Sequence, residues 1–133
     1  MRGKKLTAWH PSEGNPEPDA RKTLAALAED VRTGLLETVG IRSRLVEGEK
    51  ASILLDLPFG TDTELIARAV DLENVEAWRD PHGKVHVAIG PDYSTKDVDQ
   101  VVLSVTKVVH VLLGLHAPKP STSTLLERWL DRG

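Results

Sequence analysis

The fold is decided by the most apolar continuous part of the chain, residues 84–115, which read KVHVAIGPDYSTKDVDQVVLSVTKVVHVLLGL. Apolar side chains alternate at Val85, Val87 and Ile89, which predicts a strand with one face on the core. A turn follows, and a long helix is predicted to begin at Ser94. This strand and this helix are expected to build the core, and the rest of the chain to pack against them.

The long helix carries a broad apolar face, because Val and Leu recur along it at intervals of three and four residues. Six of the eight residues on this face are valine, a weak helix former whose χ1 is restricted. A strand for part of the segment is therefore an alternative, although the capping pair of Ser94 and Asp97 and the helical period favour a helix. The eight residues are Val98, Val101, Val102, Val105, Val108, Val109, Leu112 and Leu113.

Shorter patterns of the same kind predict the elements that precede residue 84. These elements are a helix from Asp19 to Val39, strands at residues 42–46 and 51–57, a short helix opened by the capping pair Thr61 and Glu64, and a strand at residues 75–79 that pairs with residues 84–89. The expected fold class is α+β, a two-layer sandwich in the order α-ββ-α-ββ-α. An antiparallel sheet of about four strands, made of two hairpins, packs against three helices, and a short C-terminal helical tail follows.

The length of 133 residues corresponds to one domain, and the two ends of the chain differ from its middle. Residues 1–18 hold three prolines and no periodic apolar face, and they are predicted to form a flexible N-terminal arm. Residues 19–116 form the expected single α+β domain. Residues 117–133 are interpreted as a Pro/Ser linker and an amphipathic C-terminal tail.

Charge and cysteine content exclude several classes of function. The net charge is −3 and the basic residues are scattered, so we expect no nucleic-acid and no membrane partner. The chain has no cysteine, which excludes disulfides, thiolate catalysis and cysteine-ligated metal centres. The basic N-terminus leads into no apolar run, and no apolar stretch approaches about 18 uninterrupted residues, so neither a secretion signal nor a membrane span is predicted. These features favour a cytoplasmic protein.

No catalytic motif stands out in the sequence. It contains neither a Gly-x-Ser-x-Gly nucleophile turn nor a glycine-rich phosphate loop, and we expect no catalytic residue and no cofactor. The alternative is a small enzyme or metal-binding domain centred on His82, His86 and Asp80, which lie in and after the turn of the second hairpin. No His-x-His or His-Glu-x-x-His spacing supports a metal there.

The sequence resembles two known families, one over residues 85–102 and the other in the order of its predicted elements. Residues 85–102, VHVAIGPDYSTKDVDQVV, resemble the closing strand and helix of class-V aminotransferases and cysteine desulfurases. The strand of that family usually carries a substrate-binding Arg where this chain has His86, and its large cofactor domain has no counterpart here, so no functional residue is carried over. The order of elements also resembles the fold of type III secretion chaperones, and that resemblance implies a module that dimerises and holds peptides.

Two of the three tryptophans, Trp9 and Trp129, stand in segments that are otherwise polar. An exposed tryptophan often marks a docking contact, and the alternative is that both tails fold back onto the domain. In one to two turns of helix, Leu125, Leu126, Trp129 and Leu130 share one face and form a helix-in-groove ligand. The expected function is a non-enzymatic protein-binding or adaptor module, chaperone-like and dimeric, which uses the Val-rich helix or the tail to bind itself or another protein.

Overall fold

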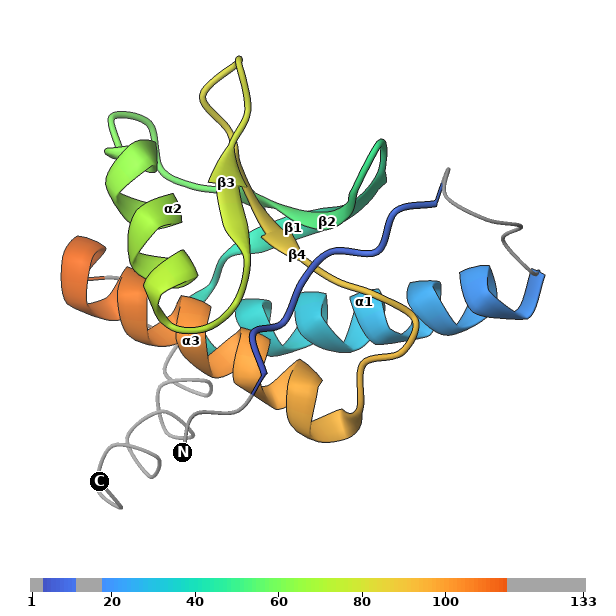
Figure 1. Cartoon of the computed structure of the whole chain (residues 1–133). Helices are drawn as coiled ribbons and strands as arrows, with labels where there is room; N and C mark the ends of the chain where they lie inside the picture. The colour runs from blue at the N-terminus through green and yellow to red at the C-terminus, as the bar shows by residue number, and fades with distance from the viewer. Residues whose placement is uncertain (1–3, 12–17, 115–133) are drawn as a thin grey trace.

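The part of the chain that the structure describes forms three helices and a four-stranded antiparallel sheet (Figure 1). The computed structural model describes residues 4–11 and 18–114, and the predicted C-terminal tail lies outside them. The expected α+β fold and its order α-ββ-α-ββ-α are confirmed. The elements are α1 (Pro18–Val39), β1 (Arg42–Glu47), β2 (Ala51–Asp56), α2 (Thr63–Leu72), β3 (Ala77–Arg79), β4 (Val85–Ala88) and α3 (Thr95–Leu113).

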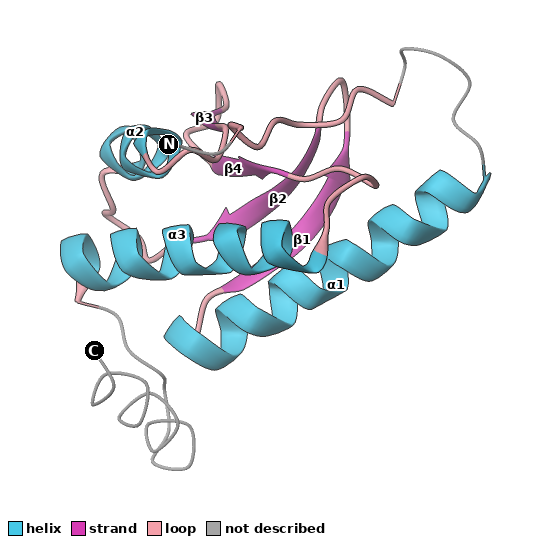
Figure 2. Cartoon of the chain, turned by 60° about the horizontal axis from the view of Figure 1, so that its bottom comes forward, coloured by secondary structure: helices cyan, strands magenta, loops and turns pink. Residues whose placement is uncertain are grey.

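The two hairpins stand side by side in one sheet, in the order β1-β2-β4-β3, and every neighbouring pair is antiparallel. Alternation along the central strands gives the sheet two different faces. Ile53 and Leu55 from β2 and Val85 and Val87 from β4 are buried on the face that carries the core. α1 and α3 lie side by side against this face, and α2 packs beside β3 and β4 (Figure 2).

The Val-rich segment is one continuous helix, so the alternative of a strand for part of it is wrong. The Ser94 hydroxyl accepts from the Asp97 N–H at 3.1 Å, and the Asp97 carboxylate accepts from the Ser94 N–H at 2.9 Å. Gly114, with a φ of 67°, ends the helix in the left-handed conformation. Burial offsets the weak helix propensity of valine, since Val101 and Val105 have no exposed surface. Among the described residues no helix, α3 included, is long and apolar enough to cross a membrane.

α1 and α3 approach closely because a glycine on one helix faces a valine on the other. A Cβ placed on Gly34 would lie 2.9 Å from Cγ2 of Val102. One turn further along both helices, the hydroxyls of Thr38 and Thr106 share a hydrogen bond of 3.0 Å. The two contacts are separated by one helical turn in each helix, so α1 and α3 run parallel.

The described N-terminal residues, 4–11, run along the sheet (Figure 1). Their backbone is hydrogen-bonded to the segment before β3 at one end, and to the end of β4 and the start of β2 at the other. Leu6 forms a parallel bridge with Val75, which lies just before the start of β3 at Ala77. The backbone of Trp9 donates to the carbonyl that follows β4 and accepts from the first residue of β2. The side chains of Leu6 and Trp9 pack against the core, so this part of the predicted arm contributes to the folded domain.

Candidate functional site

The sheet face that points away from α1 and α3 carries a chain of hydrogen bonds centred on His86. This residue alternates with the core valines of β4 and points off the core, yet only 7% of its surface is exposed. Its Nδ1 lies 2.8 Å from the Ser52 hydroxyl, and its Nε2 lies 2.8 Å from Oδ2 of Asp80. Because an ionised carboxylate only accepts, Nε2 is the donor to Asp80. The result is one polar chain that runs from β2 through β4 to the β3–β4 turn.

Asp80 organises the turn at one end of this chain. Its Oδ1 accepts from the backbone N–H groups of His82 and Lys84 at 2.8 and 3.0 Å. The hydrogen bond from His86, followed by the one from the Lys84 N–H, lowers the pKa of Asp80 from 3.8 to about 2. The ionised carboxylate therefore holds the turn and the His86 ring in one arrangement.

Aromatic and charged side chains lie next to the polar chain on the same face. Trp78 of β3 pairs with His86 across the strands, and the two rings stack with their centroids 5.5 Å apart and 1° between their planes. Nζ of Lys50 lies 4.6 Å from the Trp78 ring centroid and 2.6 Å from Oε2 of Glu76. The ammonium group is thus placed between an aromatic face and a carboxylate, both of which stabilise its charge.

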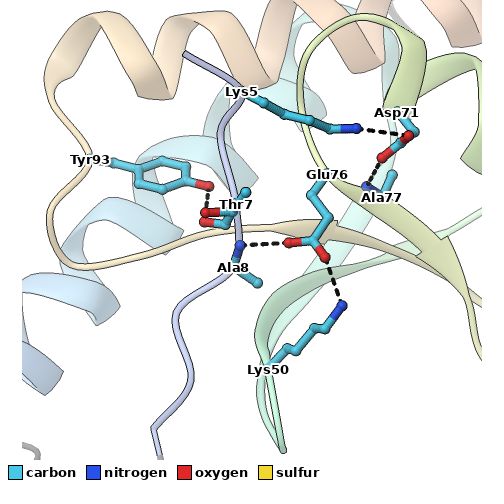
Figure 3. Close-up of polar contacts among 8 residues, drawn as sticks. All are labelled: Lys5, Thr7, Ala8, Lys50, Asp71, Glu76, Ala77 and Tyr93. Atoms are coloured by element: carbon cyan, nitrogen blue, oxygen red, sulfur yellow. Dashed lines mark hydrogen bonds and ion pairs between the residues drawn. The ribbon is translucent and has the colours of Figure 1, made fainter. Parts of the chain in front are cut away.

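Glu76 joins this cluster to the N-terminal residues (Figure 3). Its Oε1 accepts from the Ala8 N–H at 2.8 Å, while its Oε2 accepts from Lys50. Burial raises the pKa of the Glu76 carboxyl, but the hydrogen bonds from Lys50 and Ala8 outweigh burial and leave the pKa below its ordinary value. Two further contacts hold the same segment, namely the ion pair of Lys5 with Asp71 and the hydrogen bond from the Tyr93 hydroxyl to the Thr7 carbonyl, each 2.8 Å long.

The order Ser52, His86, Asp80 matches the residue types of a nucleophile, a base and an orienting acid. Only 1% of the surface of Ser52 is exposed, so an acyl substrate cannot reach its hydroxyl in this conformation. A metal needs a free lone pair on a ring nitrogen, and both nitrogens of His86 are engaged. His82 meets Asp80 through its backbone N–H. In residues 4–11 and 18–114 no three His, Cys, Asp or Glu side chains are grouped so that they could hold a metal ion.

A second site lies on the outer surface of the helical layer, where a groove of about 430 Å³ runs between α1 and α3. Most of its lining is apolar, and Leu103 at its edge has 48% of its surface exposed. Gly34 contributes no side chain, and Val102 of α3 fills the space where its Cβ would lie. One exposed carboxylate from each helix, Asp30 and Asp99, also borders the groove. The full lining is Leu27, Asp30, Gly34, Thr95, Val98, Asp99, Val102 and Leu103.

Of the partner-binding residues predicted from the sequence, Trp9 is the one that the structure describes. It is partly buried against the core of its own domain. The remaining four, Leu125, Leu126, Trp129 and Leu130, lie outside the described residues. The structure brings two of the residues of the metal alternative, Asp80 and His86, into direct contact.

Sequence reasoning missed Ser52, Trp78 and the groove at Gly34 as parts of a site. The hairpin predicted between residues 75–79 and 84–89 would place Trp78 opposite Val85, whereas the observed register places it opposite His86. The contact of Ser52 with His86 depends on the pairing of β2 with β4, which no single-sequence pattern specifies. No family model, curated protein or solved structure matches this chain.

Proposed function

We propose that the protein is a non-enzymatic protein-binding module, an adaptor or chaperone-like protein of the cytoplasm, that pairs with a second copy of itself through the outer surface of α1 and α3. The observation that carries the proposal is the apolar groove between these helices, with Leu103 exposed at its edge. Grooves of this kind take an amphipathic helix, which lays its apolar face between the two helices of the host.

Exposed apolar side chains are concentrated on the same two helices. Of the seven large ones among the described residues, four belong to α1 or α3, and these are Leu36, Leu103, Val111 and Leu112. Of these four, only Leu103 lines the groove. Burying a side chain of this size gains about 1.5–3 kcal/mol relative to water, so covering Leu103 favours association. The outer face of the sheet differs, since the polar groups around His86 are already paired with one another.

Leu103→Glu, with Leu65→Glu as its matched control, tests this proposal. Leu65 lies on α2, away from the groove, and is 46% exposed against 48% for Leu103, so either substitution places its charge at a similarly solvated position. Light scattering over a wide range of concentration should show a dimer for the wild type and for L65E. L103E should dimerise at least about tenfold more weakly, because a two-fold interface loses one leucine from each copy. A wild type that stays monomeric, or an L103E variant that dimerises as the wild type does, would refute the proposal.

The second candidate is a small enzyme or metal-binding domain centred on His82, His86 and Asp80. The contact of Asp80 with His86 supports it, although both ring nitrogens of His86 are already hydrogen-bonded. In that case Zn²⁺ or Ni²⁺ should raise the melting temperature, and His86→Ala should abolish the rise. The binding-module proposal expects a melting temperature that neither metal changes. A metal-dependent rise that survives in His82→Ala but not in H86A would move the proposal to a site at Asp80 and His86.

A further inference from the structure

We propose that the groove between α1 and α3 holds the C-terminal segment of a second copy of the chain, residues 124–132, and that two copies exchange these segments. The inference rests on the proposed function, because it takes the groove as the surface through which copies pair. It goes further by naming what occupies the groove. Residues 124–132 lie outside the described residues, and their sequence is TLLERWLDR.

In a helical conformation this segment separates its residue types by face. The apolar residues at 125, 126, 129 and 130 fall together on one side, because neighbours on a helix surface are three and four positions apart. Arg128 and Arg132 form a row along one flank of that side, while Glu127 and Asp131 form a row that faces away from it. A helix of this length spans about 13 Å, and so does the part of α3 that borders the groove, from Thr95 to Leu103.

The charges of the segment and of the groove are complementary. Asp30 on α1 and Asp99 on α3 border the groove, and both are exposed. Neither forms an ion pair with another residue of the described ranges. The arginine row beside the apolar face of the segment would meet one of these carboxylates. Such rim pairs contribute little affinity but fix the direction in which the bound helix lies.

The connector between α3 and the segment, residues 115–123, has enough length to deliver the segment to a groove. Fully extended it spans about 30 Å, whereas the end of α3 lies only about 15 Å beyond Leu103 along the helix axis. Pro118 and Pro120 favour an extended connector. Docking onto the same α3 would require the connector to turn back along the helix, against the extended conformation that the two prolines favour. An extended connector instead carries the segment to a neighbouring copy, where a two-fold axis lets each groove receive one segment.

A disulfide trap in the full chain tests this inference, because the native chain has no cysteine and an engineered pair is the sole source of thiols. The groove pair is Thr95→Cys with Arg128→Cys, and the control pair is Arg68→Cys with Arg128→Cys, Arg68 being exposed on α2. Under mild oxidation the groove pair should give a covalent dimer several-fold faster than the control pair. A cross-linked species of monomer mass would mean that the segment occupies its own groove, and equal rates for the two pairs would mean that it occupies neither. Both results overturn the inference.

Light scattering on full-chain variants separates this inference from the proposed function. Trp129→Ala should weaken dimerisation at least tenfold, whereas Glu127→Ala, on the side of the segment that faces away, should not. If W129A dimerises as the wild type does while Leu103→Glu does not, the groove pairs without the segment and only the inference fails. If L103E also dimerises normally, the proposed function fails with it.

Discussion

Replacing Gly34 by alanine should change the stability of the protein with a sign that depends on residue 102. The new Cβ would lie 2.9 Å from Cγ2 and 3.1 Å from Cγ1 of Val102, closer than such atoms are normally found. Valine has little freedom to rotate away, since its χ1 is restricted in a helix. The substitution therefore tests whether α1 and α3 approach as closely as the structure shows.

Two effects of opposite sign decide the magnitude. Alanine in the interior of a helix is favoured over glycine by about 0.5–1 kcal/mol. Overpacking between fixed elements costs about 1–3 kcal/mol. Gly34→Ala should therefore destabilise the wild type by up to about 2 kcal/mol. In a Val102→Ala background both Cγ atoms are gone and the nearest remaining atom, Cβ, is 3.6 Å away, so the same substitution should stabilise by about 0.5–1 kcal/mol.

Urea denaturation of the wild type, the two single variants and the double variant, followed by far-UV circular dichroism, completes the cycle. V102A alone supplies the control, because it removes packing without adding a contact. The expected coupling between the two positions is about 1–3 kcal/mol. If G34A stabilises both backgrounds equally, helix propensity is the only effect, and the close contact of α1 with α3 is refuted.

Three substitutions on the sheet side test the polar cluster. His86→Phe keeps a ring beside Trp78 but removes the hydrogen bond to Asp80, so the pKa of Asp80 should rise from about 2 toward 3.8 in a carboxyl NMR titration, and an unchanged pKa would contradict the bond. Because that pKa is lowered by folding, the wild type should lose stability as the pH falls from about 4 toward about 2, and H86F should lose less. Glu76→Gln should lower the free energy of unfolding by about 1 kcal/mol at neutral pH, measured by urea denaturation. Folding also lowers the pKa of Glu76, so on acidification below its ordinary pKa of 4.5 the E76Q variant should lose less stability than the wild type. Tyr93→Phe removes the donor to the Thr7 carbonyl and should speed hydrogen exchange at the amides of Ala8 and Trp9, whereas exchange in the middle of α3 should stay the same.

The fold could be predicted because each element carries its own local signal. The alternation at Val85, Val87 and Ile89 sets the strand and its buried face, and the pair of Ser94 and Asp97 marks the start of α3. These signals act between residues that are close in sequence. The Val-rich segment is a helix, as its cap and its helical period predict and as the propensity of valine alone would not.

The candidate sites depend on contacts between residues that are far apart in sequence. No local sequence pattern predicts such contacts. Ser52 meets His86 only because β2 pairs with β4, and Glu76 binds the Ala8 N–H only because residues 4–11 return to the sheet. A tail with three prolines and no apolar period gave no sign of that return. Gly34 likewise looks like an ordinary helix glycine until the partner helix is placed against it.

A substitution at Gly34 should change the stability of the helical layer and its binding of the segment in opposite directions. The missing side chain allows the close approach to Val102, and both residues line the groove. In the V102A background, Gly34→Ala should raise stability by about 0.5–1 kcal/mol while it places a methyl group in the groove. Formation of the disulfide-trapped dimer through Thr95→Cys and Arg128→Cys should then become slower, although the protein is more stable. If the trapping rate rises with stability instead, binding of the segment depends on the stability of α1 and α3 and not on the missing side chain at position 34.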